Sequence, residues 1–72
     1  MAAATPKIWP GADGQPVSCT EKLKVLAENF SELRQVAQDA FEDALLMGCS
    51  EKQVRAVFQQ VVAALENPYR KD

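Results

Sequence analysis

The residues of this 72-residue chain best suited to chemistry are two cysteines, Cys19 and Cys49. A thiolate is a nucleophile and a metal ligand, and two thiols can close a disulfide. Cys19 lies at the expected start of a helix, a position that lowers a thiol pKa. The pair predicts a redox or metal-responsive switch as one possible function, with a structurally tolerated thiol as the alternative interpretation.

A second group able to do chemistry is acidic and consists of Asp39, Glu42 and Asp43. Paired carboxylates can transfer protons or bind hard cations. The chain has no histidine, so the Glu-x-x-His pattern of di-iron bundles is missing. We interpret these carboxylates as a solvated helix face, and alternatively as a docking face for a basic partner.

Composition argues against several classes of function. Without a histidine, a glycine-rich phosphate loop or a nucleophile motif, we expect no enzymatic activity and no cofactor. Two cysteines thirty positions apart do not make a zinc pattern. The net charge of −2 and the scattered basic residues argue against nucleic acid as a partner. No long apolar run or signal-peptide core is present, so we expect no membrane association and a cytoplasmic location.

The elements that would position these groups are two helices. A long helix over 18–47 is predicted by apolar residues at alternating steps of three and four. Ser18 resembles an N-cap with Glu21 in a capping box, and Gly48 can end the helix in the left-handed conformation. The apolar residues are Leu23, Leu26, Phe30, Leu33, Ala37, Ala40, Ala44 and Met47.

A shorter helix over 51–66 follows after a tight turn. Ser50 and Gln53 form a second capping box, and Glu51 with Arg55 gives a favourable pair on the helix surface. Pro68 ends the helix because it disfavours helical geometry at the residue before it. So short a connection predicts an antiparallel helical hairpin.

Residues 1–17 contain three of the four prolines and two of the three glycines. This composition predicts an irregular or partly disordered N-terminal arm ahead of a hairpin domain over 18–72. Trp9, the only tryptophan, either packs with Ile8 against the chain's own helices or reaches a partner.

The unequal helix lengths carry a further expectation. Folded back from Gly48, the short helix covers the long one only as far as about Leu33, at about 1.5 Å per residue. Leu23, Leu26 and Phe30 then need another cover. We favour a second copy, which gives a four-helix bundle. The alternatives are the N-terminal arm, or a break near Asn29–Ser31 that gives a three-helix bundle.

The sequence thus predicts an all-α protein that acts as a small, homodimeric interaction or adaptor module and binds another protein. The expected interface consists of Trp9, Leu23, Leu26, Phe30 and Tyr69. The alternative function is the thiol switch that uses Cys19 and Cys49. No family motif supports a more specific assignment.

Overall fold

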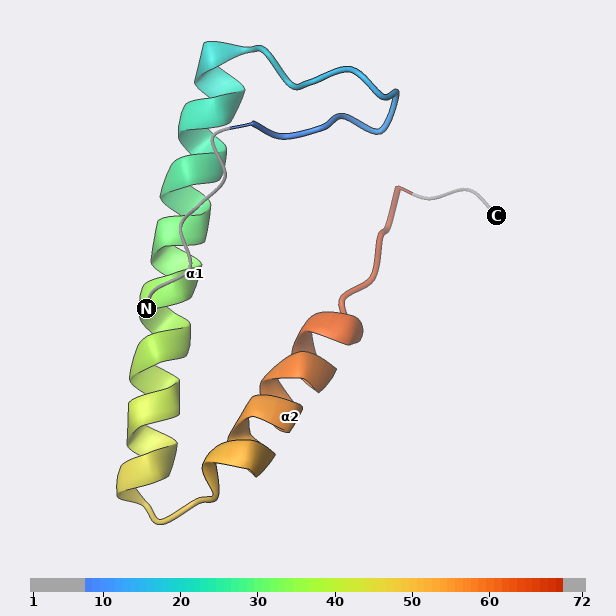
Figure 1. Cartoon of the computed structure of the whole chain (residues 1–72). Coiled ribbons are helices and arrows are strands. Elements are labelled where there is room, and N and C mark those ends of the chain that lie inside the picture. The colour runs from blue at the N-terminus through green and yellow to red at the C-terminus, as the bar shows by residue number, and fades with distance from the viewer. Residues whose placement is uncertain (1–7, 70–72) are drawn as a thin grey trace. The chain divides into compact units, whose positions relative to one another are not determined.

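The computed structural model describes residues 8–69, and this part of the chain is helical. Helix α1 spans Thr20–Leu46 and helix α2 spans Glu51–Ala63 (Figure 1). Apart from one isolated β-bridge, residues 8–69 contain no strand. The predicted all-α class and the pair of helices are confirmed. The chain divides into two compact units at Gln38 and Asp39, inside α1, and each unit is described by itself.

Helix α1 begins two residues later than the sequence predicts. The Leu23 amide donates to the Cys19 carbonyl oxygen at 3.0 Å, so Cys19 stands at the cap position instead of Ser18. The reason lies in the preceding residues, because the Val17 amide donates to the Trp9 carbonyl oxygen at 2.8 Å. That bond ties Val17 to the arm, and the helical hydrogen bonds begin after it, at the Cys19 carbonyl.

Helix α1 is unbroken through residues 29–31 (Figure 1). The alternative of a three-helix bundle with a break near Asn29–Ser31 is therefore wrong. Asn29 and Ser31 have side chains that cap helices, but capping also requires the backbone to leave helical geometry. The apolar spacing keeps its phase through Phe30, which favours a continuous helix.

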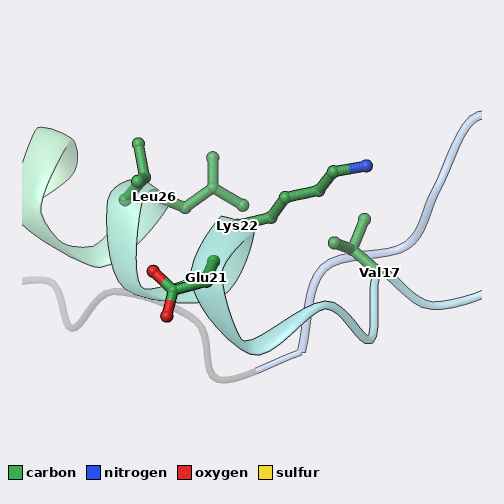
Figure 2. Close-up of a pocket in the computed structure, with 5 residues that line it drawn as sticks. Val17, Glu21, Lys22 and Leu26 are labelled. Atoms are coloured by element: carbon green, nitrogen blue, oxygen red, sulfur yellow. The ribbon is translucent and has the colours of Figure 1, made fainter.

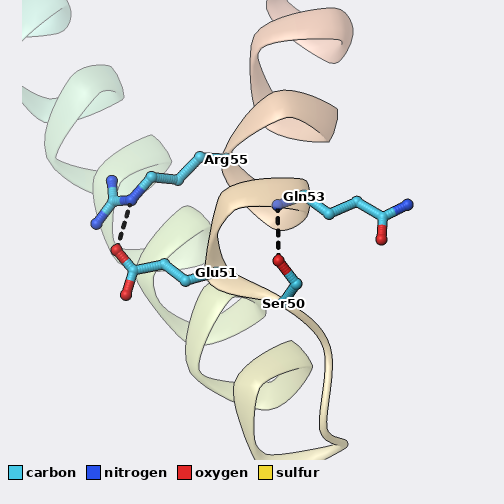
Figure 3. Close-up of polar contacts among 4 residues, drawn as sticks. All are labelled: Ser50, Glu51, Gln53 and Arg55. Atoms are coloured by element: carbon cyan, nitrogen blue, oxygen red, sulfur yellow. Dashed lines mark hydrogen bonds and ion pairs between the residues drawn. The ribbon is translucent and has the colours of Figure 1, made fainter.

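The turn after α1 agrees with the sequence in detail. Gly48 has φ of +95°, the left-handed conformation expected there. The Gly48 amide donates to the Leu45 carbonyl and the Cys49 amide to the Ala44 carbonyl, both at 3.0 Å, which is a Schellman motif. Ser50 then caps α2, because its Oγ accepts from the Gln53 amide at 3.3 Å (Figure 3).

Helix α2 ends at Ala63, three residues before the predicted end at 66. Its last turn tightens, as the Leu65 amide donates to the Val62 carbonyl three residues back at 3.2 Å. Asn67 Oδ1 accepts from the Tyr69 amide at 2.9 Å, which makes an Asx turn around Pro68. This local turn competes with continuation of the helix.

The second unit, from Asp39 on, centres on Val54, which is 8% exposed. The Phe41 and Phe58 rings meet edge to face at 6.2 Å between centroids. The Arg55 guanidinium lies 4.8 Å from the Phe41 ring centre, and Arg55 Nε donates to Glu51 Oε2 at 3.0 Å (Figure 3). The predicted Glu51–Arg55 pair is confirmed, and the arginine also stacks on an aromatic ring.

Four residues of the predicted apolar face are exposed: Phe30, Leu33, Ala40 and Met47. Beside Ala40, Phe41 is half-buried and was not predicted to lie on this face. A strict alternation of three and four residues has a period of 3.5, but an α-helix has 3.6 residues per turn. The apolar face therefore moves from Ala37 to Phe41 by a step of four.

The first unit, up to Gln38, contains the arm, which we define as residues 8–17. The chain reverses there, with the Gly14 amide donating to the Gly11 carbonyl at 3.1 Å and the Gly11 amide donating to the Gln15 carbonyl at 2.7 Å. Pro10 and Pro16 form an antiparallel bridge. Residues 8–17 of the predicted irregular arm thus form a closed loop with its own backbone hydrogen bonds. Residues 1–7 of the predicted arm lie outside the described residues.

Candidate interaction surfaces

The arm covers part of the apolar surface that the sequence left without a neighbour. The Trp9 ring lies against Phe30 on α1, with 5.1 Å between the ring centroids. Trp9, Leu23 and Leu26 are half-buried, whereas Phe30 remains 41% exposed. Packing of Trp9 on the chain's own helix is therefore the observed arrangement. Tyr69, the remaining residue of the predicted interface, is exposed in the second unit.

An apolar groove adjoins this contact where the arm joins α1. We call it the arm groove, and it has a volume of about 430 Å³. Figure 2 shows Val17 at the end of the arm, Leu26 on α1 and the Lys22 side chain extending toward Val17. The lining residues are Val17, Glu21, Lys22, Val25 and Leu26. The groove gives the first unit a place where an apolar side chain of another molecule can bind.

Helix α1 also exposes aliphatic side chains that the sequence analysis either missed or expected to be covered. Val25, Leu33 and Val36 are all exposed. Val25 and Val36 were missed because they lie beside the predicted apolar face, not on it. Together with Leu23 and Leu26, they make an apolar sector wider than a single neighbouring helix covers. The width of this apolar sector could have been found from the spacing of these residues in the sequence.

A third apolar surface lies on α2 and just beyond its end. We define the α2 ridge as Val57 and Val61 on α2 together with Leu65, two residues after the helix, and these are 44, 59 and 74% exposed. Residues 56–65 contain no ionisable side chain. Exposure rises along the ridge toward its C-terminal end.

A hollow lies beside the first residue of this ridge. It has a volume of about 330 Å³, and we call it the α2 hollow. Ala44 and Cys49 line it from the end of α1 and the turn, and the remaining lining residues come from α2: Gln53, Val54, Val57 and Phe58. None of the six is an aspartate, glutamate, lysine or arginine, so the hollow suits an aliphatic group.

The two cysteines are free and exposed. The Lys22 backbone amide is the largest cause that lowers the pKa of the Cys19 thiol, because it donates a hydrogen bond to the thiolate. Desolvation opposes this effect, while the Glu21 amide and the Lys22 charge add to it. Cys19 belongs to the first unit and Cys49 to the second.

The acidic residues Asp39, Glu42 and Asp43 are exposed, and the first two have interactions of their own. Within residues 8–69, no three His, Cys, Asp or Glu side chains come together in a way that could hold a metal ion. Neither helix of this part of the chain has the length and apolar content needed to cross a membrane.

Comparison of the chain with protein families, with curated proteins and with solved structures finds no match. The surfaces described above are therefore the basis for a functional proposal.

Proposed function

We propose that the protein is a small non-enzymatic interaction module of the cytoplasm, which works as a homodimer and binds another protein. The observation that carries this proposal is the distribution of apolar side chains. Among the described residues, Val54 is the only buried hydrophobic residue, whereas thirteen large hydrophobic side chains are exposed. Exposed apolar side chains that line one surface, as at the arm groove, are typical of association sites.

The size of the chain supports self-association. A single core in a chain this short stabilises the fold only marginally, so small domains use disulfides, metals or oligomers as additional support. Both cysteines are free here. A second copy would stabilise the fold most directly, because it would bury apolar side chains that are exposed in the single chain.

We propose that the other protein binds the predicted interface residues of this chain. This surface combines Leu23, Leu26 and Phe30 with Trp9 and the arm groove, and Tyr69 is a further contact residue of the second unit. The exposed carboxylates of Asp43 and its neighbours are a second docking face, for a basic partner.

A photo-crosslinking experiment in the cells that produce this protein tests whether it binds another protein. A photoreactive amino acid at Val25, which lines the arm groove, should give a crosslinked product heavier than a dimer of this chain. The same probe at Lys24, about 100° around the helix, is the matched control and should give none. Equal products from both positions, or none from either, would contradict this surface.

A second candidate function, the thiol-based redox switch, is favoured by the exposure and the lowered pKa of Cys19. Hydrogen peroxide would oxidise Cys19 of one copy and Cys49 of another to a disulfide, with reduction of the peroxide to two waters. Non-reducing mass spectra of peroxide-treated wild type should then show a covalent dimer. The Cys19→Ser, Cys49→Ser double variant is the control, and a wild type that stays monomeric in the spectrum rejects the switch.

A further inference from the structure

Helix α1 has an exposed apolar stripe that begins at the arm groove. We define the α1 stripe as Val25, Leu33 and Val36, which are 51, 56 and 66% exposed. At about 100° per residue, the three lie within roughly 80° of one another around the helix. All three belong to the first unit, which ends at Gln38. Because Val25 also lines the arm groove, the groove and the stripe are continuous.

Carboxylates border this stripe along one side. We define the glutamate row as Glu21, Glu28 and Glu32, whose side chains are all exposed. At about 100° per residue, the row follows the side of the stripe next to Val25 and Val36. Glu28 and Glu32 are four residues apart, a spacing at which two like charges destabilise a helix. A cation supplied by a partner would relieve this repulsion.

The basic residues of α1 leave the glutamate row with an excess of negative charge. Lys24 is placed one helical turn from Glu28, and it is the only basic residue at that spacing. Glu32 has no lysine or arginine three or four positions away on either side. Negative charge therefore remains beside Val36, in the middle of the exposed helix, and it complements a positively charged partner.

Building on the proposal that the first unit binds another protein, we propose that the partner presents an amphipathic basic helix to the α1 stripe. Its apolar side chains pack on the stripe, and its lysine or arginine side chains lie against Glu28 and Glu32. The backbone groups of α1 are bonded within the helix, so a strand finds no edge to pair with. Side chains of a second helix can interdigitate with the stripe instead. From Val25 to Val36 the stripe is about 16 Å long, which matches about three turns of the partner.

The carboxylates also argue against other occupants of this surface. Nucleic acid and anionic lipid carry negative charge, which the glutamate row repels. In a twofold pairing of two antiparallel α1 helices, each side of the interface has the same residues from both copies. Glu28 and Glu32 of one copy would then face carboxylates of the second, and such like charges select against that pairing.

A synthetic peptide tests the charge requirement. The probe is a labelled helical peptide of about five turns, with leucines on one face and lysines on both sides of that face. Fluorescence anisotropy with the full-length chain should show binding roughly tenfold or more tighter than for the same peptide with glutamates in place of the lysines. The Glu28→Gln, Glu32→Gln variant should bind the lysine peptide severalfold more weakly. Equal binding of the two peptides to wild type overturns the proposal.

The Glu42→Gln, Asp43→Asn variant is the matched control. It removes the same charge from the same helix, but from residues after the first unit. It should bind the lysine peptide as wild type does. Equal losses in the two double variants would show only attraction to an acidic chain, and a loss in the control alone would place the peptide at Asp43 and its neighbours. Either result rejects the glutamate row as the site.

Valine-to-threonine variants test the apolar part of the surface. Threonine keeps the β-branched shape and the charge but adds a hydroxyl, so it weakens apolar contact without a large change in volume. Val25→Thr, Val36→Thr should bind the lysine peptide severalfold more weakly. The control, Val61→Thr, Val62→Thr on α2, should leave its affinity unchanged. Circular dichroism follows helix content, and an undiminished affinity in the first variant contradicts packing on the stripe.

Crosslinking separates this inference from the proposed function. A photoreactive amino acid at Val36, in the cells that produce the protein, should crosslink to the same protein as the probe at Val25. Mass spectrometry of the product should give a segment with apolar residues at steps of three and four and with lysines or arginines beside them. A segment without this pattern, or a crosslinked dimer of this chain, overturns the basic helix as the occupant. If neither position crosslinks to another protein, the interaction module fails as well.

Discussion

At the scale of single residues, Gly11 is the position in the arm with the least room for a side chain. A Cβ there would lie 2.6 Å from the Gln15 carbonyl oxygen and 2.9 Å from Asp13 Oδ1. Gly11→Ala should therefore destabilise the closed loop by about 1–3 kcal/mol. Trp9, the only indole, should shift its fluorescence emission to longer wavelength as it leaves Phe30. Ala12→Ser, at the exposed neighbouring position, should leave the emission unchanged.

The Cys19 thiol should react at lower pH than an ordinary cysteine. Its pKa is lowered, so the thiolate forms, and alkylation accelerates, at a lower pH than for an unperturbed cysteine. The measurement is the rate of iodoacetamide modification against pH in a Cys49→Ser variant. Lys22→Gln keeps the backbone amide, which is the main cause, and should raise the midpoint only slightly. A wild-type midpoint at or above that of free cysteine would show that the helix start has no such effect.

The correct predictions for single residues all concern roles that depend on neighbours within four positions. Gly48, Ser50 and the Glu51–Arg55 pair were all correct, because turns, caps and i,i+4 pairs are local. Phe41 was missed because its role depends on the period of the whole helix. The contact between Trp9 and Phe30 joins residues twenty-one apart, and the sequence offered it only as one of two possibilities.

At the scale of the helices, the two predicted capping serines differ in the structure. Ser50 accepts from the Gln53 amide, whereas Cys19 takes the cap position expected for Ser18. Ser50→Ala should lower the free energy of unfolding by about 0.5–2 kcal/mol, the usual effect of losing an N-cap. Ser18→Ala is the matched control and should change it by less than about 0.5 kcal/mol. Urea denaturation measures both, and equal losses would mean that Ser18 also caps α1.

The existence and order of the helices were predictable, but three of their four ends were not. Only the start of α2 at Glu51 was placed correctly, and there the capping box follows directly on the glycine turn. The start of α1 depends on the bond between Val17 and Trp9, and the end of α2 on the turn at Asn67. Both are decided by residues outside the helices, which helix propensity does not describe.

At the scale of the whole molecule, folding and association should be coupled. With Val54 as the only buried hydrophobic side chain among the described residues, a single chain has little core to stabilise it. Because dimerisation stabilises only the folded state, Tm should rise by several degrees over about a hundredfold increase in protein concentration. Calorimetry or circular dichroism at several concentrations measures this dependence. A Tm that does not change with concentration would indicate that the monomer is stable alone.

The comparison of helix lengths predicted a cover for Leu23, Leu26 and Phe30 and favoured a second copy as that cover. In the structure, Trp9 of the arm lies against one of the three, Phe30. The comparison of lengths did not reveal the α2 ridge, because it concerned only the residues of the longer helix. The homodimer remains a prediction.

The bridge between Pro10 and Pro16 also affects how the chain avoids β-sheet growth. In this antiparallel pair the hydrogen bonds join the residues on either side, so the backbone groups of both prolines face outward. Any residue other than proline would expose a backbone N–H donor at these positions, and such a donor can pair with a strand of another molecule. Proline has none. Neither edge of the arm therefore exposes an N–H donor at its proline. Even at high concentration, this protein should not form fibrils by strand addition there.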